Sequence, residues 1–593
     1  MKHTLILIVC LTAAAASARL APADPETKAD TLVWPVLRMI DSTAIQRSGY
    51  GSAADLLAQV PGVFIFDRGS VGQLAAASLF SGSFRHLDAT WDGLLLNDPV
   101  SGIVDWNLAP VEGIERIDAW AGPGGETAGL ISPGHSLYVA GRDLAGSGLR
   151  SATAYRTGGN GYDDVDVRLG LKPTAHSALT AGAVLKNYGG TAADEKYRAQ
   201  KVNLSVERRF GPQWRLRYLL LLNKMDRDEP WSASAPQVPF LHEKLDRYDH
   251  GLGLQAHRVT VLWQYTDLYR EFYHRPSPAA QQIQNAGRSR LLMQYGQRFG
   301  PVQWNSGGLW QHSRMEITGR SDGRRNDLEA WTQIGSPAGA SWFWQAGIKV
   351  LRFGDEKIAL LPQVQLARTL ARGWNSRLWY GSHIASAGLS GGYGMESYVA
   401  GDRAFQQERS DLWAGALEKK GDAVRYFICV SYSSDRMTLS SLQSQTAAFA
   451  LDANRWAVDI GVEQKLNRCF SLYADLRQIR KGEEEPLPQP AQQAWGCVQY
   501  ANVFFAGDLD VRLRIGLNGW GERGENCLLP GTRLPSTALS PVVVPYAHVG
   551  VKIKSVRLFF LLQNFAGIDY QLLPGYAMPK QQLRWGFVWD FFD

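Results

Sequence analysis

Three short motifs in this 593-residue chain contain residue types that catalyse reactions or bind cofactors in other proteins. His242-Glu243-Lys244-Leu245-Asp246 begins like the H-E-x-x-H motif, in which two histidines on one helix face bind zinc. The second histidine is missing, and the polar neighbourhood favours a solvated loop. Gly251-Leu252-Gly253 lacks the third glycine of a dinucleotide-binding turn, and Glu483-Glu484-Glu485 is more typical of a loop tip than of a cation site.

No pair of a nucleophile and a base stands out elsewhere in the sequence, and there is no Walker loop. We therefore expect no catalytic residue, no cofactor and no metal site, and the protein is not expected to be an enzyme. The 62 Lys and Arg residues are interspersed with 56 Asp and Glu residues, and the net charge is only +6. A basic stripe of the kind that binds nucleic acid is therefore not indicated.

The composition narrows the fold class. The chain has 20 Trp, 22 Tyr, 22 Phe and 60 Gly, its charged fraction is 20%, and its mean hydropathy is −0.21. The many aromatic residues argue against a disordered chain, and the lack of a long apolar run beyond the N-terminus argues against a helical membrane protein. A large β protein remains. Four cysteines beyond the N-terminal segment allow three disulfide pairings, which we leave open: Cys429, Cys469, Cys497 and Cys527.

The first 30 residues are typical of an export signal followed by a flexible segment. Lys2 precedes an apolar run from Leu5 to Ala16, and Ala16-Ser17-Ala18 supplies the small residues of a cleavage site. We expect residues 1–18 to be the signal peptide and residues 19–30, which are rich in Pro, Ala and Asp, to be flexible.

The elements of residues 149–593 must be strands, because apolar and polar residues alternate there. One example has Leu513, Ile515 and Leu517 on one face and Arg512 and Arg514 on the other. Such alternation predicts strands with one apolar and one wet face. If each strand with its connection takes about 20 residues, residues 150–593 form about 22 antiparallel strands. The same alternation occurs in three further segments: 164–172, 456–463 and 583–591.

Two features favour a transmembrane barrel over a soluble sandwich. Charges of both signs follow one another on the polar face, as a crowded lumen requires, and tryptophans lie near the expected strand ends, as at membrane interfaces. These tryptophans are Trp214, Trp374, Trp456, Trp495 and Trp585. With an export signal, the pattern predicts a monomeric barrel surrounded by lipid in the cell outer membrane of Gram-negative type.

The connections are expected to differ in length at the two ends of the barrel. Short breaks at Phe210-Gly211-Pro212, Phe299-Gly300-Pro301 and Lys554-Ser555 predict periplasmic turns. Long polar stretches predict extracellular loops at 226–249, 321–327, 391–410, 482–493 and 519–539.

In residues 31–145, short apolar stretches are mixed with helical patterns, which predicts a small α/β domain. Its motifs follow a fixed order: a strand at Val36–Asp41, a capped helix from Ser52 to Pro61-Gly62, then Asp92-Gly93, Asn97-Asp98, Glu115-Arg116 and Gly122-Pro123. In this order the motifs resemble the plug domain of TonB-dependent outer-membrane receptors. The C-terminal segment from Asn564 to the final aromatic strand is similar to the closing strands of the same family.

This resemblance implies a plug inside the barrel lumen and a partner, the periplasmic TonB protein, that pairs with a short extended segment of the receptor. Asp30-Thr31-Leu32-Val33 resembles such a TonB box, although it directly precedes the first plug strand. Glu115 and Arg116, beside Asp118, are expected to fasten the plug to the wall. A ligand-facing plug apex is expected at Phe80, Ser83, Arg85 and His86.

The leading hypothesis is an outer-membrane receptor that binds a scarce solute such as a metal chelate and imports it. As a family, such receptors take siderophore-, cobalamin- or haem-like solutes. The alternative is a receptor-like barrel that has lost energy coupling and serves as a binding or scaffold subunit of an outer-membrane complex. Two features motivate this alternative: the cramped TonB box, and Ser81-Gly82 where the family usually has Arg-Gly.

Overall fold

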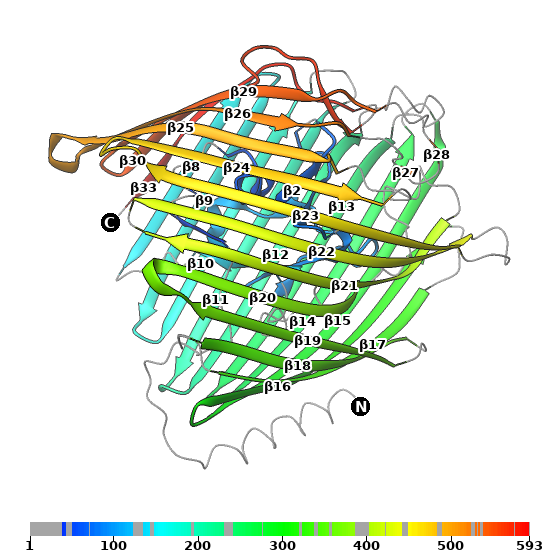
Figure 1. Ribbon diagram of the computed structural model, residues 1–593. Coiled ribbons are helices and arrows are strands. Elements are labelled where there is room, and N and C mark those ends of the chain that lie inside the picture. The colour runs from blue at the N-terminus through cyan, green and yellow to red at the C-terminus, as the bar shows by residue number, and fades with distance from the viewer. Residues whose placement is uncertain are drawn as a thin grey trace.

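The protein is a closed barrel around an N-terminal domain, as the computed structural model shows (Figure 1). The structure describes the following residues: 38–42, 45, 50–69, 71–82, 84–121, 135–142, 148–190, 195–229, 241–274, 277–318, 323–336, 342–354, 358–385, 403–421, 423–441, 449–482, 489–523, 528–529, 532–533, 538–573 and 576–591.

Twenty-two antiparallel strands form the ring, which confirms the predicted number. In ring order they are β8 (Leu149–Gly158), β9 (Tyr162–Thr174), β10 (Ser177–Tyr188), β11 (Tyr197–Phe210), β12 (Trp214–Glu229), β13 (Leu241–Ala256), β14 (Val259–His274), β15 (Ser277–Phe299), β16 (Val302–Ile317), β17 (Gly323–Gly335), β18 (Trp342–Phe353), β19 (Ala359–Thr369), β20 (Trp374–Ala385), β21 (Arg403–Lys420), β22 (Val424–Ser441), β23 (Phe449–Lys465), β24 (Phe470–Lys481), β25 (Gln492–Phe504), β26 (Leu509–Trp520), β29 (Val542–Ile553), β30 (Val556–Gln563) and β33 (Gln582–Phe591). The ring closes where β33 pairs with β8, with Phe587 opposite Tyr155.

Short elements lie in the connections between barrel strands. They are η5 (Ala371–Gly373), η6 (Phe505–Gly507), β27 (Leu528–Leu529), β28 (Thr532–Arg533), β31 (Gln571–Leu573) and β32 (Tyr576–Ala577). No helix in the part of the chain that the structure describes is long and apolar enough to cross a membrane.

The two faces of the sheet carry the residues that the alternation predicts. On β26, Ile515 and Leu517 are 55% and 52% exposed on the outer face, whereas Arg512 and Arg514 face the lumen and are half-buried. On β23, Trp456 is 53% exposed in the interior of the strand rather than at its end. The outer surface is therefore apolar across the strand centres, and not only near the strand ends.

The predicted short turns are confirmed at one end of the barrel, where β11 and β12, β15 and β16, and β29 and β30 follow each other closely. The long loops are shorter than predicted. The stretch 226–249 is strand up to Glu229 and again from Leu241, and the stretch 391–410 is strand from Arg403 onward. Polar composition was misleading at 226–249, because β12 and β13 turn charged side chains such as Arg227, Glu243 and Arg247 into the lumen, where the charges pair.

The N-terminal domain is built on a five-stranded sheet in the order β1-β6-β7-β4-β5, with β2 and β3 paired separately. Its elements are β1 (Arg38–Asp41), α3 (Ala53–Leu57), β2 (Val63–Asp67), β3 (Ala75–Leu79), η1 (Phe84–His86), β4 (Leu87–Trp91), β5 (Leu94–Leu95), η2 (Trp106–Leu108), η3 (Val111–Gly113), β6 (Ile114–Ala121) and β7 (His135–Gly141). These elements lie within the expected range 31–145, and Figure 1 shows the domain in blue inside the barrel.

The predicted helix start is confirmed by its hydrogen bonds. The Asp55 N–H donates to Ser52 Oγ at 3.3 Å, and the Ser52 N–H donates to Asp55 Oδ2 at 3.0 Å. This reciprocal pair satisfies two N–H groups that the first helical turn leaves without partners. Leu56 and Leu57 of the helix are buried in the core that the plug shares with the barrel wall.

A charge on the outer face should destabilise the barrel. Ile515→Lys is expected to cost about 2 to 4 kcal/mol, because a cation near the bilayer midplane loses its hydration. The free energy of folding into lipid vesicles measures this, with Ile515→Leu as the control of similar volume. Equal stability of the two variants would mean that this face does not meet hydrocarbon.

Candidate functional site

The turn between β4 and β5 contacts the barrel wall through both its carboxylate and its backbone. Asp92 and Gly93 have φ values of 49° and 95°, as a type I′ turn requires, so the predicted Asp-Gly turn is confirmed. Asp92 Oδ2 accepts a hydrogen bond of 2.7 Å from Arg217 Nη2 of β12. The Gly93 carbonyl accepts another from Gln264 of β14. Two neighbouring regions of the wall thus hold this turn.

Asn97 shapes the loop that follows β5. Its Nδ2 donates to Asp88 Oδ1 and to the Gly102 carbonyl, both at 2.8 Å, and its Oδ1 accepts from the Ala89 N–H at 3.1 Å. An asparagine has donors and acceptors on one short side chain, so it can bridge a strand and a loop in this way. The Asn-Asp motif therefore begins with a structural residue.

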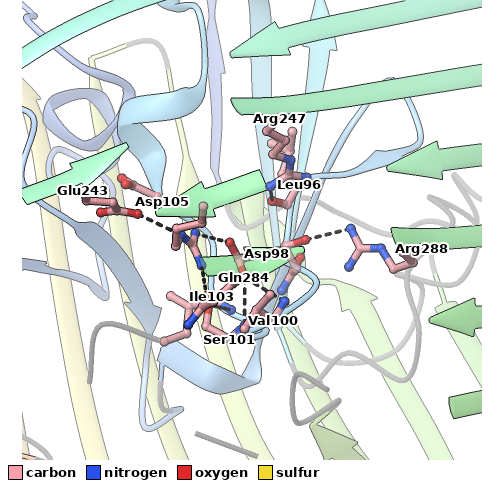
Figure 2. Close-up of polar contacts among 12 residues, drawn as sticks. Leu96, Asp98, Val100, Ser101, Ile103, Asp105, Glu243, Arg247, Gln284 and Arg288 are labelled. Atoms are coloured by element: carbon pink, nitrogen blue, oxygen red, sulfur yellow. Dashed lines mark hydrogen bonds and ion pairs between the residues drawn. The ribbon is translucent and has the colours of Figure 1, made fainter. Parts of the chain in front are cut away.

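Asp98 connects this loop to the wall by an ion pair. Its Oδ1 accepts 2.8 Å hydrogen bonds from the N–H groups of Val100 and Ser101, and its Oδ2 accepts from Arg270 of β14 (Figure 2). Burial by itself raises the pKa of Asp98, but the Arg270 guanidinium and the N–H donors outweigh burial and lower the pKa to about 2. The carboxylate is therefore ionised and held on both sides.

Glu243 extends this ion pair into a chain of alternating charges. Its Oε1 lies 2.8 Å from Arg270 Nε, and its Oε2 lies 2.7 Å from Arg227 Nη2. Arg227 in turn donates to Asp105 Oδ2 of the plug at 3.0 Å. Glu243 is fully buried, so each of its oxygens needs such a partner. The chain joins two positions of one plug loop to three barrel strands.

The solvated-loop interpretation of 242–246 is therefore wrong. These residues belong to β13, and His242 Nδ1 lies 2.6 Å from Asp228 Oδ1 of the adjacent strand. The sequence carried no clear strand signal here, because Lys244 and Asp246 place charges on the face opposite Glu243 and Arg247 as well.

Arginines of the wall also bind backbone carbonyls of the plug. Arg247 Nη1 donates to the Leu96 carbonyl at 2.7 Å, and Arg288 Nη2 donates to the Asn97 carbonyl at 2.7 Å (Figure 2). Asp249 fixes the Arg247 guanidinium by accepting from its Nε at 2.8 Å. We call the contacts of plug residues 92–105 with β12–β15 the arginine clamp.

Glu112, which the sequence gave no reason to single out, fastens the plug elsewhere. It pairs with Arg156 of β8, and Tyr50 hydrogen-bonds to the same carboxylate while its ring lies 4.8 Å from the guanidinium carbon. The expected residue Arg116 instead pairs with Asp118 of its own strand at 2.9 Å and remains half exposed. Charge pattern alone did not reveal which carboxylate meets the wall.

The expected plug apex faces the barrel wall rather than open space. The Phe80 ring is fully buried, with its centroid 6.3 Å from that of Phe427 and 6.5 Å from that of Trp379. A Cβ at Gly62, where φ is +77°, would lie 2.5 Å from this ring, so the Pro-Gly motif makes room for it. His86 is buried, with its ring 4.8 Å from that of His383.

A cavity of about 210 Å³ lies between the plug and another part of the wall. Its wall residues come from β10, β25, β26, β29, β30 and β33, near the barrel end with the longer connections, and we call it the outer cavity. Its plug residues come from α3 and from the segment 67–75. The polar and aromatic lining includes Gln59, Gln73, Asn107, Trp495, Asn518, Tyr546, His548, Gln563, Asn564, Tyr570 and Gln582.

The charges around the outer cavity are mainly positive. Lys186, Arg514 and Arg584 line it, against the two carboxylates of Asp55 and Asp67. Burial raises the pKa of Asp67 to about 7, so this carboxyl is only partly ionised at neutral pH. The arrangement can bind a polar solute, and the excess of cations favours an anionic one.

Several expected positions lie outside the described residues. These are the TonB box at Asp30, Thr31, Leu32 and Val33, the motif Gly122-Pro123, Ser83, the side chain of Arg85, and Cys527. The three cysteines that the structure describes, Cys429, Cys469 and Cys497, form no disulfide with one another. Within the described ranges, no three His, Cys, Asp or Glu side chains are grouped to hold a metal ion.

Comparison with known proteins agrees with both parts of the fold. Residues 36–134 match the family model of the TonB-dependent Receptor Plug Domain. The whole fold is similar to that of the siderophore receptor PirA from Pseudomonas aeruginosa, with a TM-score of 0.72 and 10% identity over 94% of this chain and 99% of that one. Residues 36–134 are therefore a plug domain of the TonB-dependent receptor type, and the chain as a whole has the plug-and-barrel fold.

Two further receptors of known structure have the same fold at low identity. The ferric citrate transporter FecA gives a TM-score of 0.72 with 13% identity, covering 93% of this chain and 96% of FecA. The FrpB iron transporter from Neisseria meningitidis gives 0.75 with 10% identity, covering 94% and 100%. At these identities the likeness establishes the plug-and-barrel fold, and the ligand must be argued from the site.

The arginine clamp should weaken when Asp98 loses its charge. Because the pKa of Asp98 is lowered to about 2, its ionised form stabilises the folded plug above about pH 4, and this contribution disappears as the pH falls towards 2. Asp98→Asn is expected to lose about 2 kcal/mol at pH 7, or roughly 30-fold in local opening. Hydrogen exchange of residues 96–105, corrected for intrinsic rates, measures this.

The matched control is Asp569→Asn, which removes an exposed carboxylate that pairs with Lys580 at the surface. This control should leave exchange in residues 96–105 unchanged. A difference between wild type and Asp98→Asn that persists undiminished at pH 2 would contradict the role of the charge.

Proposed function

We propose that this protein is an outer-membrane receptor that binds a scarce siderophore-, cobalamin- or haem-like solute and imports it into the periplasm, driven by TonB. The observation that carries the proposal is the outer cavity. It lies between plug and wall at the end of the barrel where the connections are long, which is the extracellular end in outer-membrane barrels.

The lining of the outer cavity suits a polar, anionic solute of the metal-chelate class. Arg514 and Arg584 can bind carboxylate or similar oxygens, and Trp495 and Tyr570 offer aromatic faces. At about 210 Å³ the cavity is smaller than the roughly 300–1,000 Å³ of ordinary ligand pockets, so a larger chelate would extend out of it. The names of PirA, FecA and FrpB, which refer to siderophores, ferric citrate and iron, point to the same class.

Import requires the plug to move, because its core fills the lumen against the wall. In our proposal TonB supplies the force by pairing with Asp30-Thr31-Leu32-Val33 as an added strand. This segment lies just before β1, which pairs with β6 from Arg38 opposite Ala119 to Asp41 opposite Arg116. A pull on the box would therefore first strain the edge strand of the plug sheet.

The short distance between the box and β1 favours one alternative. Only residues 34–37 separate them, so a box that must reach a periplasmic partner has little spare length. If coupling has been lost, the protein would be a receptor-like barrel that serves as a binding or scaffold subunit of an outer-membrane complex.

Substitutions in the box distinguish these functions. Growth of a deletion strain and its parent on ferric citrate, haem or cobalamin as the single source first identifies the solute. Leu32→Pro removes a backbone N–H and should reduce uptake of that solute to the level of the deletion strain, since strand addition depends on backbone hydrogen bonds. Leu32→Ala keeps the N–H and should retain most of the uptake.

Full uptake by Leu32→Pro would contradict energy coupling through this segment. Isolation of the intact protein from detergent extracts then tests the alternative. Partner proteins in fixed stoichiometry would support the scaffold function, whereas TonB as the single partner would support import.

A further inference from the structure

A second, smaller cavity lies deeper along the same side of the barrel. It has a volume of about 30 Å³ and lies between Pro61 of the plug and strands β22–β25. We call it the inner cavity. Its remaining lining residues are Arg425, Phe427, Gly461, Val462, Glu463, Tyr473, Asp475 and Trp495.

Trp495 lines both cavities and so forms part of the partition between them. Its ring centroid lies 6.4 Å from that of Tyr473, which lines the inner cavity. The guanidinium of Arg514, which lines the outer cavity, lies 6.0 Å from the Tyr473 ring centroid. The partition is therefore made of side chains, with Trp495 shared by the two cavities.

The inner cavity leads towards the periplasmic end of the barrel. Arg425 is the second residue of β22, beside the short connection from β21, and Glu463 lies two residues before the end of β23, beside the short connection to β24. Arg425 is partly exposed and pairs with Glu418 at 2.8 Å, so its charge stays hydrated near the rim. A solute that reached the inner cavity would thus be close to the periplasm.

The plug is held less firmly here than at the arginine clamp. Pro61 has no N–H to donate, and it faces Gly461, where a Cβ would lie 3.4 Å from Pro61 Cγ and 2.7 Å from Asp475 Oδ1. The nearest backbone contact is the hydrogen bond from Gln493 Nε2 to the Val63 carbonyl, at 3.4 Å. A small displacement of this edge of the plug would therefore break fewer strong contacts than a displacement at β12–β15.

We infer that Trp495 is the gate between the outer and inner cavities, and that the solute passes to the periplasm along the wall formed by β22–β25. This inference rests on the proposed function in treating the outer cavity as the entry site. It adds the route and the residue that closes it. Rotation of the indole ring joins the two cavities, and a displacement of Pro61 away from Gly461, where the two now pack closely, widens the passage.

A thiol placed in the inner cavity tests the gate without knowledge of the solute. Glu463→Cys is introduced into a full-length chain whose own cysteines beyond the signal are replaced by serine. Intact porin-deficient cells lacking TonB receive the membrane-impermeant reagent 2-sulfonatoethyl methanethiosulfonate from outside. Adding Trp495→Ala should increase the labelling rate about tenfold, equivalent to a barrier about 1.4 kcal/mol lower.

The matched control is Trp456→Ala on β23, since this tryptophan faces outward, 53% exposed. It should leave the rate unchanged, and Trp495→Phe, which keeps a ring, should stay near the parent. Heat-modifiable migration on gels shows that each barrel is folded. The gate is overturned if folded Trp495→Ala is labelled no faster than the parent, or if Trp456→Ala accelerates labelling equally.

These outcomes are independent of the uptake experiment. Labelling needs neither solute nor TonB. The labelling result would therefore still show whether Trp495 closes the passage, even if the import hypothesis were wrong. Conversely, if uptake depends on the TonB box but Trp495→Ala does not change labelling, the import function is supported and Trp495 is not the gate.

Discussion

Cations buried in the lumen need acceptors, and this requirement determines how the plug and the barrel fit together. Arg227, Arg247 and Arg270 are almost fully buried on strands that face the plug. A buried guanidinium without partners is costly, and water is largely displaced by the plug. Glu243 and Asp249 of the wall supply some of the acceptors. Plug carboxylates and plug carbonyls supply the others, and the loop after β5 presents both kinds. The buried arginines of the barrel thus depend on hydrogen-bond acceptors that the plug supplies.

The contacts between plug and wall are unequal around the ring. Strands β8–β15 hold the plug through ion pairs, such as those of Arg156 with Glu112 and of Arg270 with Asp98. Strands β22–β26 instead meet it through aromatic rings, two cavities and hydrogen bonds of uncharged groups, such as those of Ser431 and Ser433 with the Ser81 backbone. A small displacement costs little energy where the contacts are apolar, whereas breaking a buried ion pair is costly because it leaves a charge unpaired. The difference allows one part of the plug to stay fixed while another part shifts.

Much of the fold follows from local pattern in the sequence. Period-2 alternation predicts the barrel because Ile515 and Arg514 must point to opposite faces of one strand, and the Ser52 capping box and the Asp92-Gly93 turn depend only on neighbouring residues. The clamp could not be predicted in this way. Glu243 and Arg270 lie on different strands, and a polar stretch such as 242–246 has the composition of a loop until the charged plug opposite it is known.

The residues of the site were the hardest to predict, because their roles depend on long-range packing. Glu112 and Arg116 are both charged and lie four positions apart, yet only Glu112 meets a barrel arginine. Trp495 resembles a membrane-interface residue in the sequence, whereas the structure places it in the lumen between two cavities. Neither distinction is visible without the register that pairs each strand with its neighbour.

The pairing of β33 with β8 has a consequence for assembly. These two strands complete the ring, and they are the barrel strands farthest apart in the chain. Until they meet, the sheet has two open edges whose N–H and C=O groups lack partners, and hydrocarbon tolerates such edges poorly. The unfinished sheet must therefore be protected until the ring closes. The pairing of β33 with β8 is the single event that removes both open edges, so it could signal to an assembly machine that the barrel is complete.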